Sequence, residues 1–233
     1  MDKRIVLITG SSTGLGRATA VRLKKLGYTV YITSRTAEKV EKVAKEIGTS
    51  SVALDVTDEK SIIKAVELIK EKEGKIDILI NNAGIPGGFS KPAEIDAAAM
   101  KNVFDTNVFG LVSVTYHFLT LLEKSSFPVI VNVSSGLGSF GQVQNPTKIE
   151  SKVNSLAYSS SKAAVSMLTV QYAKGLPNIK INAVDPGPTN TGENFSNGIQ
   201  TLEEGSDVIV ELATIDQNGP TGCFFNREGV IPW

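Results

Sequence analysis

The sequence of 233 residues contains one cysteine, one histidine and one tryptophan, and aromatic residues make up only 6% of it. The single thiol, Cys223, cannot form a disulfide within the chain, which excludes a disulfide-rich secreted domain and favours a cytoplasmic location. Net charge is also lacking, because 24 basic side chains balance 24 acidic ones. This balance argues against nucleic acid and anionic membranes as partners.

Long apolar runs and metal-binding patterns are absent as well. No stretch approaches the ~20 apolar residues that a membrane-spanning helix needs, and the N-terminal residues enter a short β-branched run without a signal-peptide core. The lone His117 has no cysteine, histidine or carboxylate at a metal-ligand spacing, so we expect no metal site. These absences leave a globular chain with no membrane segment as the expectation.

The sequence does contain 21 glycines and a regular alternation of two patterns. Short, nearly continuous apolar runs predict buried parallel strands at residues 4–9, 29–33, 51–54, 76–80, 129–133, 180–184 and 222–225. Segments with helical spacing lie between them, including two longer ones at about 97–122 and 157–174. The alternation predicts one α/β domain, a doubly wound seven-stranded parallel sheet with helices on both faces.

A glycine-rich loop, G-S-S-T-G-L-G at residues 10–16, follows the first predicted strand. Glycine allows positive φ angles, close approach of the backbone to a phosphate, and tight packing of the next helix. The N–H groups at the start of that helix can bind a pyrophosphate. A glycine turn alone would be ordinary, but its position between a strand and a helix predicts a Rossmann-fold dinucleotide site.

The end of the second predicted strand carries Ser34 and Arg35 and no carboxylate. NAD-binding folds usually place an acidic residue there for the ribose hydroxyls. A guanidinium can instead pair with the 2′-phosphate of NADP. We therefore predict that NADP(H) is preferred and NAD(H) possible, with a solvated arginine before a helix as the alternative interpretation of Arg35.

A second pattern begins with Ser134 and Ser135 after the fifth predicted strand and continues with Tyr158 and Lys162. Tyr158 and Lys162 are four residues apart on a predicted helix, so they share a face. A neighbouring ammonium is expected to lower the pKa of a tyrosine, ordinarily ~10, so that it exchanges protons near neutral pH. Singly, such a pair is usually a surface feature and a double serine is usually a turn; their place after a dinucleotide loop favours catalysis.

Together these segments resemble the short-chain dehydrogenase/reductase family. The resemblance runs in the family's order from residue 4 to about 191 and includes the loop at 9–16, Asp55-Val56, N-N-A-G at 81–84, Asn107, Ser134-Ser135, Tyr158-x-x-x-Lys162 and D-P-G-P-T at 185–189. The C-terminal segments at 203–205 and 219–225 are similar to the carbonyl-reductase-like branch, which is a less specific match.

The resemblance implies an oxidoreductase that moves hydride between nicotinamide and a carbonyl or alcohol substrate. Ser135, with Ser134 as the alternative, is expected to hydrogen-bond the substrate oxygen, and Tyr158 to exchange the proton. Lys162 is expected to bind the nicotinamide ribose, and Asn107 to hold a water that links Lys162 to solvent. Hydride transfer itself is the chemistry of the cofactor.

The expected cofactor contacts are Gly10, Ser12, Thr13, Gly14, Leu15, Gly16, Ser34, Arg35, Asp55, Val56, Asn82, Ala83, Gly84, Tyr158, Lys162, Pro186, Gly187, Thr189 and Thr191. The expected substrate contacts are Ser135 and three loop phenylalanines, Phe89, Phe140 and Phe195, although loop phenylalanines pack locally as often. The domain is expected to span residues 1–233, with a cofactor half at about 1–125 and a catalytic and substrate half at about 126–233.

The interval of 23 residues from Ser135 to Tyr158 is longer than the family's usual one. Its extra stretch, around 143–156, is polar and resembles an insertion of carbonyl-reductase-like members that covers the active-site rim and helps keep some of them monomeric. We expect a modified substrate entrance, a shallow permissive pocket, and a monomer or homodimer.

Two other functions were weighed against a small-molecule carbonyl or alcohol reaction. A non-catalytic NADP(H)-binding sensor would be expected to lack Tyr158 or Lys162, and both are present. A related reaction such as epimerisation or enoyl reduction is disfavoured, since enoyl reductases of the family usually space tyrosine and lysine more widely and extended epimerases are usually longer. The identity and stereochemistry of the substrate do not follow from the sequence.

Overall fold

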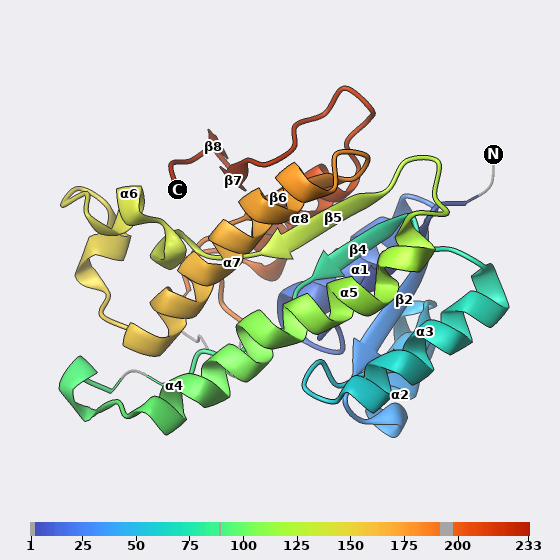
Figure 1. Ribbon diagram of the computed structural model, residues 1–233, viewed down its shortest axis with the longest axis horizontal. Coiled ribbons are helices and arrows are strands. Elements are labelled where there is room, and N and C mark those ends of the chain that lie inside the picture. Colours follow the sequence, from blue (N-terminus) through green and yellow to red (C-terminus); the bar gives the residue numbers. More distant parts are fainter. Residues whose placement is uncertain (1–2, 89, 192–197) are drawn as a thin grey trace.

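The computed structural model describes residues 3–88, 90–191 and 198–233 (Figure 1). Its centre is a sheet with the strand order β3-β2-β1-β4-β5-β6-β7-β8. The strands are β1 (Ile5–Ile8), β2 (Thr29–Ser34), β3 (Ser50–Ala53), β4 (Ile78–Asn81), β5 (Val129–Val133), β6 (Lys180–Val184), β7 (Phe224–Asn226) and β8 (Gly229–Val230). All neighbouring pairs from β3 to β7 are parallel, and β8 pairs with β7 antiparallel.

The doubly wound parallel sheet predicted from the sequence is confirmed, and β8 is an addition to it. The bounds of β5 and β6 coincide with the predicted runs at 129–133 and 180–184. β8 has only two residues, and the first of them, Gly229, has a φ of 125°. Two residues are too few to show an alternation, so the sequence pattern could not reveal this strand.

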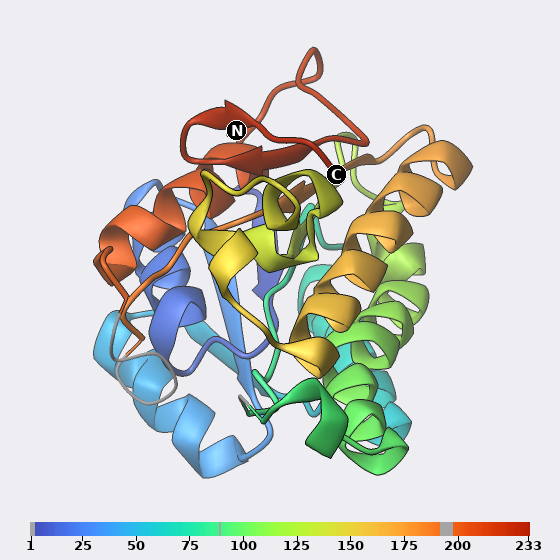
Figure 2. The same cartoon turned by 90° about the vertical axis from the view of Figure 1, so that its left-hand side faces the viewer.

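Helices cover both faces of the sheet (Figures 1 and 2). The α-helices are α1 (Gly14–Lys25), α2 (Ala37–Ile47), α3 (Glu59–Glu73), α4 (Ala97–Phe104), α5 (Gly110–Leu122), α6 (Phe140–Val143), α7 (Leu156–Gly175) and α8 (Leu202–Ala213). Shorter turns are η1 (Pro92–Glu94), η2 (Asp105–Phe109), η3 (Gly136–Gly138) and η4 (Ile149–Lys152). One face is packed by α1, α2 and α8, and the other by α3, α5 and α7.

The central strands β1, β4 and β5 are buried on both sides, which explains their nearly unbroken apolar sequence. In β1, Val6 and Ile8 belong to the core beneath α1, α2 and α8, whereas Ile5 and Leu7 belong to the core beneath α3 and α5. Successive side chains of a strand point to opposite faces, so a strand covered on both faces must be apolar at every position.

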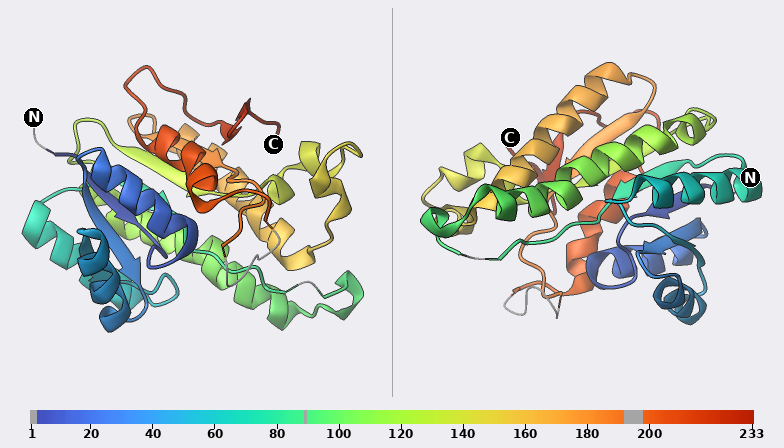
Figure 3. Two further views of the ribbon diagram at one scale, coloured as in Figure 1. Left: turned by 180° about the vertical axis from the view of Figure 1, so that it is seen from behind. Right: turned by 60° about the horizontal axis from the view of Figure 1, so that its bottom comes forward.

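The predicted helix at 97–122 is continuous through α4, η2 and α5, but its middle turn, η2, has π-helical geometry. Such turns insert an extra residue into a helix and are frequent at functional sites. This turn contains Asn107, which is buried. The combined helix runs beside α7, as the right-hand view of Figure 3 shows.

The loops that follow β1, β4, β5 and β6 all leave the same edge of the sheet, because these strands are parallel. In doubly wound folds this carboxyl edge is where ligands bind, at the point where the strand order reverses. Here the reversal lies between β1 and β4. No helix within the described ranges is long and apolar enough to cross a membrane.

Candidate active site

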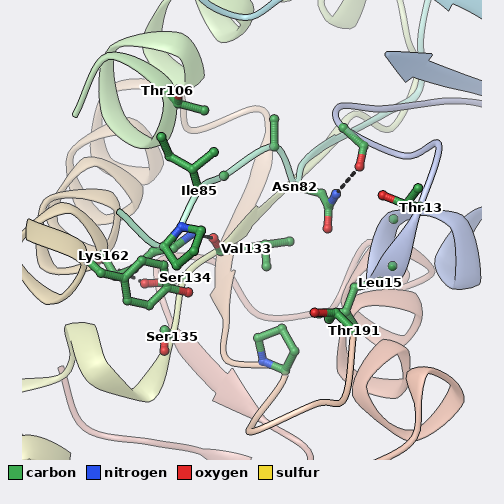
Figure 4. A pocket seen from close by; sticks show the side chains of 18 of the residues that line it. Thr13, Leu15, Asn82, Ile85, Thr106, Val133, Ser134, Ser135, Lys162 and Thr191 are labelled. Carbon is green, nitrogen blue, oxygen red and sulfur yellow. Dashed lines mark hydrogen bonds between the residues drawn. The ribbon is translucent and has the colours of Figure 1, made fainter. Parts of the chain in front are cut away.

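A cavity of roughly 950 Å³ lies along this carboxyl edge (Figure 4). Every predicted cofactor contact lines it, and so does the predicted catalytic residue Ser135. Asn107 lies behind the wall, and Phe140 is not part of it. Phe89 and Phe195 lie outside the described residues. The predicted cofactor contacts thus lie along one cavity, and their binding of a cofactor stays a prediction.

The glycine loop is shaped by close contacts with the loop after β4. Gly10 has a φ of 60°, and a Cβ on it would lie 2.9 Å from the Cα of Ala83. A Cβ on Gly16 would lie 2.6 Å from Nδ2 of Asn82. That amide nitrogen donates hydrogen bonds of 2.9 and 3.0 Å to the carbonyl oxygens of Thr9 and Gly10. Two of the glycines are thus required by packing between neighbouring loops.

Gly14 differs from the other two, because its surroundings are open toward the cavity. It has a φ of 55°, and the nearest side chain to a Cβ placed there is Thr191, at 3.8 Å. Helix α1 begins at this residue, and its N-cap residue, Thr13, makes no side-chain capping hydrogen bond. The first N–H groups of the helix therefore remain available to an anion in the cavity.

One end of the cavity is basic. Ser34 ends β2, Arg35 follows it, and Lys39 lies in the first turns of α2; all three line the cavity. Within the described residues, neither cation forms an ion pair with a carboxylate. Sequence reasoning found Arg35 and missed Lys39, although a second cation four residues later was the available signal.

The neighbouring wall comes from the loop after β3. Asp55 and Val56, both predicted, lie there together with Thr57. One carboxylate oxygen of Asp55 accepts hydrogen bonds from the backbone N–H and the hydroxyl of Thr57, at 2.9 and 2.7 Å. This local turn fixes the loop in place beside the glycine loop.

The opposite end of the cavity contains Tyr158 and Lys162 of α7. Lys162 is only 4% exposed, and its ammonium donates a 2.7 Å hydrogen bond to the carbonyl oxygen of Val133. The same ammonium lies 5.6 Å from the centre of the Tyr158 ring. Ser135 lines the same end of the cavity, and its side chain is close enough to the Tyr158 hydroxyl to lower the pKa of that hydroxyl. Two hydroxyl groups therefore meet beside one buried cation.

The two adjacent serines have different surroundings. Ser134 is 2% exposed; its hydroxyl donates to the carbonyl oxygen of Lys162 at 3.0 Å and lies 3.1 Å from the hydroxyl of Ser166. Ser134 thus fastens β5 to α7. Ser135 meets Tyr158 and also accepts a 3.2 Å hydrogen bond from the N–H of Leu137. Only Ser135 is placed with the tyrosine hydroxyl.

Asn107 joins three elements behind the catalytic end. Its Nδ2 donates to the carbonyl oxygen of Ile85 and to the hydroxyl of Ser161, both at 3.0 Å, and its Oδ1 accepts from the N–H of Ile85 at 2.8 Å. A Cβ on Gly84 would lie 3.3 Å from Oδ1 of Asn107 and 3.5 Å from Nζ of Lys162. The side chain holds the loop after β4 against α7, while its expected role in holding a water stays a prediction.

Burial dominates the protonation of the catalytic groups. Loss of solvent raises the pKa of Tyr158 to about 12, and the negative charge of Asp185 adds to this, while the hydrogen bond from Ser135 opposes it. Burial also lowers the pKa of Lys162 to about 8, against the opposing effect of Asp185. The pKa of Tyr158 is thus raised in the protein alone, not lowered as expected, because burial is the largest effect on it.

A family model described as short chain dehydrogenase matches residues 4–198. The chain belongs to this family. The match begins just before β1 and passes the loop after β6. It therefore includes the glycine loop, Asn107, Ser135 and the pair on α7. The resemblance inferred from the sequence motifs is confirmed.

Relatives within the short-chain dehydrogenase family extend the match over most of the chain. "Short-chain dehydrogenase anuI" of Penicillium roqueforti (strain FM164) is 38% identical, covering 92% of this chain and 90% of the relative. An "NADPH-dependent pterin aldehyde reductase" of Arabidopsis thaliana is 37% identical, covering 81% and 76%. The structure of salutaridine reductase from Papaver somniferum aligns with a TM-score of 0.83 at 27% identity, covering 96% and 99%.

The substrate end of this dehydrogenase cavity differs from the predicted one. Phe140 begins α6, is 69% exposed and does not line the cavity, so the structure does not support the expected substrate contact. The wall is instead formed by apolar side chains of three other segments and by two carboxylates: Ile85, Pro86, Leu137, Ile149, Val153, Glu150 and Asp185. Several of these come from the polar stretch at 143–156, whose few apolar residues were the signal that went unused.

Proposed function

We propose that the chain is an NADP(H)-dependent reductase of ketones or aldehydes that also oxidises the corresponding alcohols. The observation that carries this proposal is the cavity itself, which joins the cations Arg35 and Lys39 at one end to the hydroxyl pair of Ser135 and Tyr158 at the other. The Arabidopsis relative, an NADPH-dependent aldehyde reductase by name, supports the same cofactor and reaction.

The residues present fit a dinucleotide carrying an extra phosphate. Gly14 leaves open space at the start of α1, where free N–H groups can bind a pyrophosphate. Thr191 borders this space with its Cβ and methyl carbons, and its buried hydroxyl has no hydrogen-bond partner among the described residues. Such an atom is normally satisfied by a ligand or water. Arg35 and Lys39 can pair with a 2′-phosphate.

The protein's own groups handle the proton, while the bound cofactor supplies or accepts the hydride. Ser135 donates a hydrogen bond to the carbonyl oxygen and stabilises the negative charge that develops on it during reduction. Tyr158, which is neutral because its pKa is about 12, donates its phenolic proton to that oxygen. Lys162 stabilises the resulting phenolate, and alcohol oxidation uses the same groups in reverse.

Replacing Tyr158 with phenylalanine tests the proposal directly. The variant should bind NADPH within about twofold of the wild type, because the ring and its packing are kept. Turnover of a carbonyl substrate, followed by NADPH absorbance, should fall roughly 10³-fold, the effect of losing a general acid. Tyr116→Phe is the matched control, since that hydroxyl is exposed on α5. Unchanged turnover in Tyr158→Phe would overturn the proposal.

A further inference from the structure

Asp185 stands apart from the groups that the proposed reaction uses. It follows β6 directly, is only 7% exposed, and lines the cavity beside Tyr158 and Lys162. Sequence reasoning treated it only as part of a loop motif. A buried carboxylate is unfavourable unless it is hydrogen-bonded or paired. Its partners therefore indicate why it is there.

The carboxylate of Asp185 connects two loops. Oδ1 accepts a 3.0 Å hydrogen bond from the N–H of Gly187, in the loop after β6. Its other oxygen, Oδ2, lies against Gly136, the residue that follows Ser135, and the N–H of Gly136 favours the charged carboxylate. One side chain thus connects the turn that carries Ser135 with the loop after β6, which is expected to contact the cofactor.

Charge is the second property of this site. Burial is the largest effect on the pKa of both Tyr158 and Lys162. The negative charge of Asp185 adds to the rise in the pKa of Tyr158 and partly offsets the fall in the pKa of Lys162, so it favours the proton-bearing form of both. Glu150 of η4 faces Asp185: a Cβ on Gly136 would lie 2.9 Å from an oxygen of each carboxylate. Burial raises the pKa of Asp185, and repulsion from Glu150 adds to this rise. The N–H groups of Gly187 and Gly136 and the charge of Lys162 oppose it.

The remaining charges near this end of the cavity have partners or lie at its basic end. Asp105, also in the wall, is paired with Lys101. Arg35 and Lys39 belong to the basic end with Ser34. Glu150 and Lys162 are therefore the charged groups of the described wall that face Asp185.

We propose that Asp185 is a positioning residue, which locks the Ser135 turn to the Gly187 loop and places a carboxylate beside Tyr158 and Lys162. This inference rests on the proposed function. A displacement of about 1 Å between reacting groups can lower a rate ~10²-fold, so a side chain that fixes two loops affects turnover without touching the substrate.

Asp185→Asn tests both parts. Its amide oxygen can still accept from Gly187, but its NH₂ group cannot accept from Gly136, and the charge is lost. We expect kcat for carbonyl reduction to fall at least tenfold with the NADPH dissociation constant within about twofold. Reduction needs Tyr158 and Lys162 protonated, so activity falls as the pH rises and these groups lose their protons. Without the negative charge of Asp185 they should lose them at lower pH. The basic limb of the kcat/KM profile should therefore move to lower pH by at least half a unit.

Two further variants make the result decisive. Asp185→Glu keeps the charge and should return the basic limb toward its wild-type position even if kcat stays low. Glu211→Gln, an exposed change of equal charge on α8, should leave the profile unchanged. A purely structural role predicts a lower kcat with an unmoved basic limb, and that result would overturn the inference, as would wild-type behaviour of Asp185→Asn. Either of these two results would remove the role of Asp185. The proposed function would still stand if Tyr158→Phe is inactive.

Discussion

The two ends of the cavity are built in different ways. The basic end consists of backbone and exposed cations: Gly14 with a positive φ, uncapped N–H groups of α1, and Arg35 and Lys39 without carboxylate partners in the described ranges. The catalytic end consists of buried side chains, each held by another element. Lys162 donates to the carbonyl oxygen of Val133, and Asn107 binds the backbone of Ile85.

This difference predicts two kinds of response to mutation. At the basic end each cation acts on the ligand independently, so losses of binding energy should add. At the catalytic end the side chains hold one another in place, so removing one displaces several and the effects should not add. The three predictions below test that contrast.

The largest effect is expected at the basic end, from the double variant Arg35→Ala/Lys39→Ala. Each cation should contribute about tenfold to kcat/KM with NADPH, because each can form a charge-assisted hydrogen bond with the 2′-phosphate. The double variant should therefore lose roughly 100-fold with NADPH and change less than threefold with NADH. Steady-state rates with both cofactors measure this.

Lys42→Ala is the matched control, because Lys42 is exposed on the same helix and does not line the cavity. It should leave both rates unchanged. If the loss of kcat/KM in the double variant differed from the product of the losses in the two single variants, the cations would act together. The contrast between the two ends of the cavity would then disappear. An equal loss with NADPH and NADH would contradict the assignment to the 2′-phosphate.

A smaller effect on activity, with a cost in stability, is expected from Asn107→Ala. The change removes three hydrogen bonds and leaves the N–H and carbonyl of Ile85 unpaired. Leaving buried polar groups unpaired should lower the free energy of unfolding by about 2 kcal/mol. Turnover should fall about tenfold, because the loop after β4 loosens beside Lys162.

Urea unfolding and steady-state rates measure the two consequences in the same samples. Asn102→Ala is the stability control, because Asn102 is exposed on the same continuous helix. If Asn107→Ala lost stability with full turnover, its role would be confined to folding. If it lost neither, the linked catalytic end described above would be wrong.

The same contrast explains what could be predicted from the sequence. The strands could be predicted because burial on both faces demands continuous apolar runs, and the basic end because glycine spacing and Arg35 act locally. Lys39 was missed because only the residues directly after the second strand were considered, and Lys39 lies on the helix that follows them. Along one chain segment, spacing alone determines which groups share a surface.

The catalytic end resisted prediction wherever a contact joins distant segments. Tyr158 and Lys162 could be paired by helical spacing, but the direction of the tyrosine pKa depends on burial and on Asp185, which is 27 positions from it in the sequence. Phe140 was chosen by its position after a strand, which does not determine where its side chain points. The π-helical turn at Asn107 and the two-residue β8 have no periodic signature of their own.

The smallest effect concerns Lys162 and pH in the cofactor-free protein. Its pKa is about 8 when folded, against an ordinary value near 10.5, so between these values the unfolded chain binds a proton that the folded chain does not. Stability attributable to Lys162 must therefore rise with pH across this window, by about 1 kcal/mol from pH 8 to pH 9. Urea unfolding of the wild type and of Lys162→Met at both pH values measures this contribution as the difference in free energy of unfolding between the two proteins. Other groups titrate equally in both and cancel from the difference. A difference that stays constant or shrinks would mean that Lys162 is solvated, and the catalytic end would then be as open as the basic one.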